Sequence, residues 1–138
     1  MSARLQKIEQ ICKKYQVKAF YVFGSRSADM LRAIEDDMYQ PTSSQSDLDI
    51  GVLTRSPFSI ESKVNLTLEL EAIFNAPRVD LFVLQEVDAF LAANIIRGER
   101  IYAEDPYLAD EYDLFVLRRA GDLAELERQR IAMILQEA

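Results

Sequence analysis

The most informative segment of this chain is Ser46-Asp47-Leu48-Asp49-Ile50-Gly51-Val52. Apolar residues alternate here with other residues, and this period of two is typical of a β-strand with one face in the core. Residues two apart point to the same side of a strand, so Asp47 and Asp49 project together while the apolar residues enter the core. The segment therefore predicts two carboxylates side by side on a half-buried strand.

Apolar patterns on both sides of this segment predict further elements. Before it we expect a helix over 5–15, a strand over 18–23, a short helix after Gly24-Ser25 and a polar loop over 39–46. After it we expect a helix over 59–74 capped by Ser59, a strand over 78–84, a helix over 88–97 closed by Gly98 and an extended segment over 100–103. The tail from Pro106 onward is predicted to form two helices, broken near Gly121 with Asp122 as the second cap.

This order of elements predicts an α/β (α+β) fold, with a small mixed β-sheet flanked by helices and with C-terminal helices. The length of 138 residues, 49% of them hydrophobic, predicts a single domain over 1–138, with a core of about 5–103 and a helical extension over 106–138. The sequence has neither an apolar run of the roughly 18 residues that a membrane helix needs nor an apolar signal-peptide core. We therefore expect a cytoplasmic protein with no membrane partner.

The composition excludes several kinds of chemistry. The chain has no histidine and a single cysteine, Cys12, so it contains no Ser-His-Asp triad, no multi-cysteine zinc site and no internal disulfide. Reactions must then use carboxylates, hydroxyls, lysines or a metal held by oxygen atoms. Sixteen basic residues against 23 acidic ones give a net charge of −7, which argues against nucleic acid as the main ligand.

Two adjacent carboxylates need an explanation. Like charges at the spacing of Asp47 and Asp49 repel, or raise one another's pKa, unless a cation neutralises them. A site that offers only oxygen ligands suits Mg²⁺ or Mn²⁺. The alternative is that the two residues are a solvent-facing pair on a half-exposed strand.

A third acid, Asp80, lies within the apolar run Arg78-Val-Asp-Leu-Phe-Val-Leu84. Burying an unpaired carboxylate costs several kcal/mol, so Asp80 needs a partner, a metal or an open cleft. If its strand neighbours the strand of Asp47 and Asp49, three carboxylates converge. The alternative is a salt bridge to Arg78 or to another arginine.

The dipeptide Gly24-Ser25 follows a buried apolar strand and precedes a short helix. Glycine lets the backbone approach a ligand closely, and the amides at a helix start can bind phosphate oxygens together with a serine hydroxyl. Gly-Ser turns are common, so the interest of this one comes from its position.

Taken together, these features resemble the DNA polymerase β-like nucleotidyltransferase superfamily, and within it the minimal nucleotidyltransferases, the MNT antitoxins found beside HEPN toxins. The resemblance covers roughly residues 5–103 and ends in Phe90-Leu-Ala-Ala-Asn-Ile-Ile-Arg-Gly-Glu-Arg-Ile-Tyr102. It implies ATP as substrate and two Mg²⁺ ions, or Mn²⁺. It also implies roles for site residues: metal binding and catalysis by Asp47, Asp49 and Asp80, and phosphate binding by Gly24, Ser25 and Arg26.

The chain departs from the family pattern in the Gly-Ser turn. The family reads Gly-Ser-x-Ala-Arg-Gly, whereas this turn lacks the second glycine and its arginine. The spacer between Ser25 and Asp47, residues 26–46, is also longer than in the family. Its effect is either to shape the choice of acceptor or to weaken triphosphate binding through its acidic residues.

The resemblance implies an acceptor and a partner: transfer of AMP to a tyrosine hydroxyl of a HEPN ribonuclease toxin, which neutralises the toxin in a hetero-oligomer. Two alternatives stay open, a catalytically weak module that inhibits its partner by occlusion and an enzyme that modifies a small molecule. Apolar residues of the C-terminal segment are either a partner surface or additional core, namely Leu114, Val116, Leu117, Leu123, Leu126, Ile131, Ile134 and Leu135.

Overall fold

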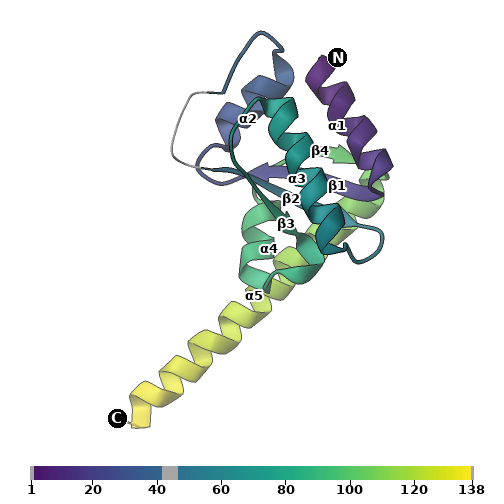
Figure 1. Cartoon of the computed structure of the whole chain (residues 1–138). Coiled ribbons are helices and arrows are strands. Elements are labelled where there is room, and N and C mark those ends of the chain that lie inside the picture. The colour runs from purple at the N-terminus through teal and green to yellow at the C-terminus, as the bar shows by residue number, and fades with distance from the viewer. Residues whose placement is uncertain (1, 42–46, 138) are drawn as a thin grey trace.

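The computed structural model describes residues 2–41 and 47–137 (Figure 1). Its strands form one sheet: β1 (Val17–Phe23), β2 (Leu48–Thr54), β3 (Val79–Val83) and β4 (Glu99–Ala103). Its helices are α1 (Ala3–Lys14), α2 (Ser27–Glu35), α3 (Ile60–Phe74), the 3₁₀ turn η1 (Leu84–Glu86), α4 (Ala89–Ile96) and α5 (Pro106–Glu137). Of the predicted loop 39–46, residues 42–46 lie outside this description, as does Ser46 of the acidic segment.

The sheet is mixed, as predicted, with the strand order β3-β2-β1-β4. Strand β2 pairs antiparallel with β1 and parallel with β3, and β4 pairs antiparallel with β1. Consequently the end of β1 and the starts of β2 and β3 lie at one edge of the sheet. The register places Phe23 opposite Asp49, and Asp49 opposite Asp80.

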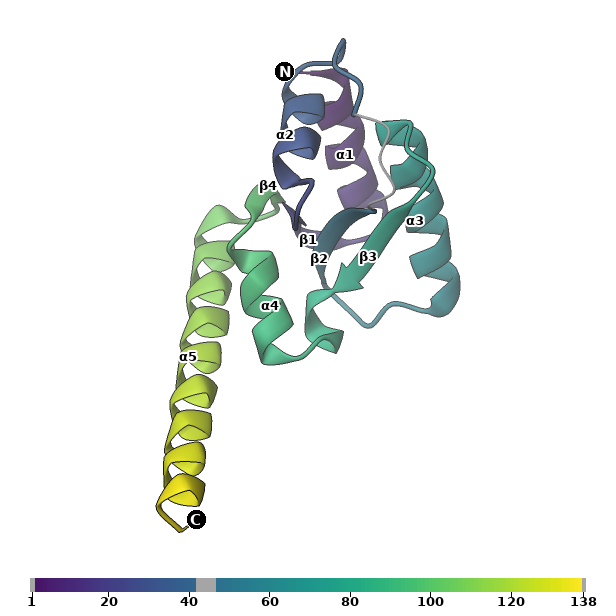
Figure 2. The same cartoon turned by 90° about the vertical axis from the view of Figure 1, so that its left-hand side faces the viewer.

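Helices cover both faces of the sheet (Figure 2). Helices α1, α2 and α3 pack on one face and bury Phe20, Val22 and the β2 residues Leu48, Ile50 and Val52. Helices α4 and α5 pack on the other face, against Tyr21 and Phe23. Successive β1 residues thus enter opposite cores, which is why this strand reads as continuously apolar. Cys12 is buried in the first core.

Local signals start and stop the helices where the sequence predicts. The Ser59 side chain accepts a hydrogen bond from the Ser62 amide at the start of α3, and Asp88 accepts from the amides of Phe90 and Leu91 at the start of α4. Asn75 ends α3 in the left-handed conformation, with φ of 49°. Such caps satisfy amide and carbonyl groups that a helix leaves unpaired at its ends.

The predicted break near Gly121 is wrong, because α5 runs without interruption from Pro106 to Glu137. One glycine inside a helix costs only about 1 kcal/mol, and the flanking alanine, leucine, glutamate and arginine residues favour the helix. Asp122 therefore caps no second helix. Beyond Ala120, the last buried residue of α5, the described side chains are all exposed and the helix projects from the body (Figures 1 and 2).

A polar network anchors the first half of α5 to the sheet. The Tyr21 hydroxyl in β1 donates a hydrogen bond to Asp113 of α5. Arg100 in β4 donates to the Asp113 carboxylate across 3.0 Å and pairs with Asp110 across 2.8 Å. Burial, followed by the hydrogen bond to Asp113, raises the pKa of Tyr21, so this hydroxyl stays protonated.

We expect Tyr21→Phe to lower the free energy of unfolding by about 1–2 kcal/mol, because Asp113 loses a donor in a partly buried site. Urea unfolding measures this difference. The matched control is Tyr107→Phe, since Tyr107 is 69% exposed and its hydroxyl makes no hydrogen bond with the described residues. Equal stability of the two variants would contradict the anchoring role.

Candidate active site

Three acidic side chains gather at one edge of the sheet. Asp47 directly precedes β2, Asp49 lies in β2 and Asp80 lies in β3. The parallel register sets Asp49 beside Asp80, and the antiparallel register sets the end of β1 beside Asp49. The expected convergence of the three carboxylates therefore follows from the strand pairing.

The carboxyl group of Asp47 lies next to that of Asp80 and, in addition to burial, raises its pKa. The Arg78 Nε atom lies 3.2 Å from the Asp47 Oδ1 atom, and 73% of the Arg78 side chain is exposed. Arg78 thus pairs with Asp47, whereas its effect on Asp80 is limited to a small opposing charge.

The pKa values of Asp49 and Asp80 are both raised. Burial raises the pKa of Asp49, and the charges of Asp80 and Asp47 raise it further. Burial also raises the pKa of Asp80, followed by the hydrogen bond and the charge of Asp47, while Arg78 opposes the shift. Negative charge is therefore concentrated beyond what the neighbouring arginine balances, and a divalent cation would relieve the repulsion.

Asp47, Asp49 and Asp80 could hold a metal ion together with a bound substrate. Among residues 2–41 and 47–137, no group of three acidic or cysteine side chains forms a complete metal-binding cluster. Mg²⁺ is usually held by one or two carboxylates together with waters and substrate phosphates, not by an all-protein cage. The adjacent oxygen ligands of Asp47, Asp49 and Asp80 suit this mode of binding.

The turn after β1 requires glycine at position 24, beside the three acids. Its φ of 82° lies in the region that favours glycine. A Cβ atom at this position would overlap the Asp49 Oδ2 atom and lie 3.3 Å from the Asp49 Cγ atom. The backbone therefore passes directly against Asp49, and the neighbouring Ser25 is exposed at the same edge.

Helix α2 begins at Ser27, directly after the Gly24-Ser25 turn that follows β1. Arg26 occupies the N-cap position, and its side chain does not cap the helix. Amide groups at a helix start are suited to bind phosphate oxygens, as the sequence predicts for the Gly24-Ser25 turn.

The structure places Asp29 and Tyr39, which the sequence did not indicate as site residues, beside the predicted Arg26. The Arg26 guanidinium pairs with the Asp29 carboxylate across 2.7 Å, and both side chains are largely buried. The Tyr39 hydroxyl donates to the same carboxylate, and the Arg32 guanidinium lies 4.4 Å from the Tyr39 ring centre. The three-residue spacing of Arg26 and Asp29 is a sequence signal for the first pair. No local pattern marks Tyr39.

Comparisons with known proteins agree with this architecture. A family model described as "Polymerase beta, Nucleotidyltransferase" matches residues 6–107. A chain in the structure of a tri-AMPylated Shewanella oneidensis HEPN toxin with MNT antitoxin is 18% identical, with a TM-score of 0.66 and 96% of each chain covered. A chain of a toxin–antitoxin complex with AMP-PNP is 19% identical, with a TM-score of 0.64 and the same coverage.

A structure described as a "putative minimal nucleotidyltransferase" is 21% identical to this chain, with a TM-score of 0.51, and the match covers 70% of this chain and 86% of that chain. At these identities the solved structures establish a shared fold. A comparison with curated proteins found no match. None of the helices in the described part of the chain is long and apolar enough to span a membrane.

Proposed function

Because this chain belongs to the polymerase beta nucleotidyltransferase family, we propose that it is an antitoxin that transfers AMP from ATP to a tyrosine hydroxyl of a HEPN toxin. The observation that carries the proposal is the convergence of Asp47, Asp49 and Asp80 beside the Gly24 turn. Two similar structures are described as an AMPylated HEPN toxin with its MNT antitoxin and as a toxin–antitoxin complex with AMP-PNP.

Each residue of the site has a role in this proposal. Asp47, Asp49 and Asp80 would hold Mg²⁺, which neutralises phosphate charge and lowers the pKa of the acceptor hydroxyl when it is bound. The Asp80 carboxylate accepts the proton of that hydroxyl. The hydroxyl oxygen forms a bond to the α-phosphorus, the bond from this phosphorus to the bridging oxygen breaks, and pyrophosphate leaves.

The triphosphate would lie over the turn that follows β1. The backbone at Gly24, the exposed Ser25 and the start of α2 bind the β- and γ-phosphates. Arg26 neutralises them, and its ion pair with Asp29 fixes the direction of its guanidinium group before the nucleotide arrives.

A protein partner fits the remaining surface. The projecting half of α5 exposes Leu126, Ile134 and Leu135, each of them at least 52% accessible. Of the apolar C-terminal residues, Val116 and Ala120 are core, so the exposed ones favour a partner surface over additional core. The net charge of −7 favours a protein partner over nucleic acid. We expect the hetero-oligomer to act in the cytoplasm.

The test is co-expression with a HEPN toxin, followed by intact-mass analysis of the purified toxin. We expect a mass increase of one or more AMP groups with the native chain, and none with Asp47→Ala, which leaves the toxin active. Glu61→Gln is the matched control, since this exposed acid lies on α3, away from both the three acids and α5, and it should modify the toxin normally. If the Asp47→Ala variant still silences the toxin without any increase in the toxin's mass, the protein inhibits its partner by occlusion and not by AMP transfer.

A further inference from the structure

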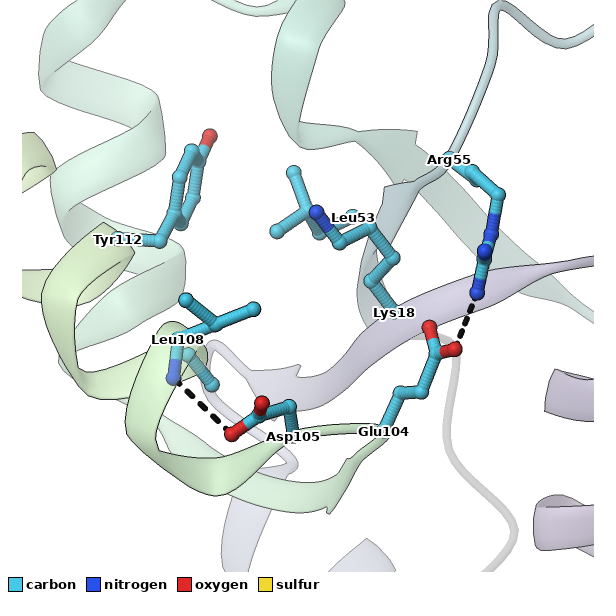
Figure 3. Close-up of a pocket in the computed structure, with 8 residues that line it drawn as sticks. Lys18, Leu53, Arg55, Glu104, Asp105, Leu108 and Tyr112 are labelled. Carbon is cyan, nitrogen blue, oxygen red and sulfur yellow. Dashed lines mark hydrogen bonds and ion pairs between the residues drawn. The ribbon is translucent and has the colours of Figure 1, made fainter.

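A cavity lies at the opposite end of the sheet from the three acids, since Val17 pairs with Thr54 there while Phe23 pairs with Asp49 beside the acids. Figure 3 shows the residues that line it. Its volume is about 470 Å³, within the range of small-molecule sites. It lies where the end of β2 and the start of β1 meet the first turns of α5, and five strand positions separate Asp49 from Thr54 at this end. At a rise of about 3.3 Å per residue, the two sites are about 16 Å apart.

The two acids that line this cavity, Glu104 and Asp105, both have interaction partners within the chain. Glu104 forms an ion pair with Arg55. The Asp105 Oδ1 atom accepts hydrogen bonds from the amides of Tyr107 at 3.0 Å and Leu108 at 3.3 Å, and so caps α5. Within the described part of the chain, neither carboxylate pairs with a lysine at this site.

A cation and a hydroxyl remain available in the cavity. The Lys18 side chain extends from β1 into the cavity that Leu53 and Tyr112 also line (Figure 3). Lys18 is partly buried, yet its ammonium group forms no ion pair or hydrogen bond with the described residues. The Tyr112 hydroxyl likewise has no hydrogen-bond partner among them, and burial raises its pKa, so it remains a donor.

The rest of the wall is apolar. Leu53 and Ala109 are buried, and Leu108 covers the space from the first turn of α5. A partly buried ammonium without a counter-charge favours an anion, and the apolar wall favours a hydrocarbon body next to it.

We propose that this cavity is a binding site for a small carboxylate with an apolar body. The carboxylate accepts hydrogen bonds from the Lys18 ammonium and the Tyr112 hydroxyl, and the hydrocarbon body packs on Leu53, Leu108 and Ala109. Such a ligand ties the base of α5 to the sheet. The site is independent of the nucleotidyl transfer proposed above, because it uses none of the same residues.

Titration with octanoate, followed by methyl NMR of the full chain, tests the proposal. We expect saturable shifts of the Leu53 and Leu108 methyl signals, with octanol binding more weakly and octylamine not binding. Lys18→Met should weaken octanoate binding about tenfold, the effect of about 1.4 kcal/mol from a charge-assisted contact. Octanol binding should change less than twofold in this variant, because it depends on the apolar wall alone.

Three further variants distinguish binding in this cavity from nonspecific binding of octanoate elsewhere on the surface. Lys13→Met removes a lysine charge from the exposed end of α1 and should bind octanoate normally. Tyr112→Phe removes a single oxygen atom and should weaken octanoate binding. This variant tests the proposal if Lys18→Met does not fold. Asp49→Asn should bind octanoate like the native chain. The absence of saturable shifts, or equal affinity in Lys18→Met and Lys13→Met, would overturn the proposal.

Discussion

Asp49→Asn is expected to abolish nucleotidyl transfer and, at the same time, to raise the thermal stability of the protein. The stability effect comes from the raised pKa of Asp49, caused by burial and then by the charges of Asp80 and Asp47. A carboxyl whose pKa is higher in the folded state than in the unfolded state stabilises the fold while it is protonated. That contribution is lost as the pH rises through the folded-state pKa, so the ionised carboxylate destabilises the fold at neutral pH.

Asparagine has nearly the same volume as aspartate and no charge to bury. We therefore expect the melting temperature to rise by a few degrees at neutral pH without divalent cations, and the difference to vanish in acid, where Asp49 is protonated. Mg²⁺ with ATP should stabilise the native chain and not the variant. Thermal melts over a pH series measure both effects.

The activity effect of the same variant is larger. Neutralisation of phosphate charge by a bound metal ion supplies several kcal/mol, and a loss of about 4 kcal/mol lowers the rate about a thousandfold. Initial rates of AMP transfer measure it. Glu61→Gln, which removes an exposed acid from α3, should leave the rate unchanged and shift the melting temperature little. A fully active Asp49→Asn variant, or one less stable than the native chain, would contradict this description of the site.

Gly24→Ala is expected to reduce both stability and activity. Its φ of 82° is unfavourable for alanine by about 1–2 kcal/mol. The added methyl group would also overlap the Asp49 Oδ2 atom, which forces either the turn or the carboxylate to move. We expect a loss of at least about 2 kcal/mol in the free energy of unfolding, and transfer slowed at least about a hundredfold by the displaced carboxylate.

Gly121→Ala is the matched control, with the opposite sign. Gly121 lies inside α5, and an added Cβ atom would meet no other atom within 4 Å. The same substitution should therefore stabilise the protein by about 0.5–1 kcal/mol and slow transfer far less than Gly24→Ala does. Urea unfolding and transfer rates of the two variants measure these differences. Similar behaviour of the two variants would show that the Gly24 turn is not specially constrained.

The sequence predicts the sheet and the placement of the acids because those features depend on local periodicity. Alternation at 47–52 fixes which side chains of β2 leave the core, and the apolar run around Asp80 marks a neighbouring buried strand. The helix caps at Ser59 and Asp88 likewise depend on residues within three positions. Short-range patterns therefore specify most of the elements and the edge at which the acids meet.

Other features depend on contacts that no local pattern encodes. Tyr21 and Asp113 are hydrogen-bonded although 92 positions separate them, and Tyr39 reaches Asp29 across an irregular segment. The continuity of α5 is a different case, since the cost of Gly121 is outweighed by its helix-forming neighbours. The cavity around Lys18 also escapes prediction, because three separate segments of the chain line it.

The most direct measurement is incubation of the purified chain and a HEPN toxin with Mg²⁺ and ATP labelled at the α-phosphate, beside the Asp47→Ala/Asp49→Ala variant. The arrangement of the three acids predicts label on a toxin tyrosine with the native chain and none with the variant. A toxin that is bound and inhibited without acquiring label would contradict it, and would mean that this protein neutralises its partner by binding alone.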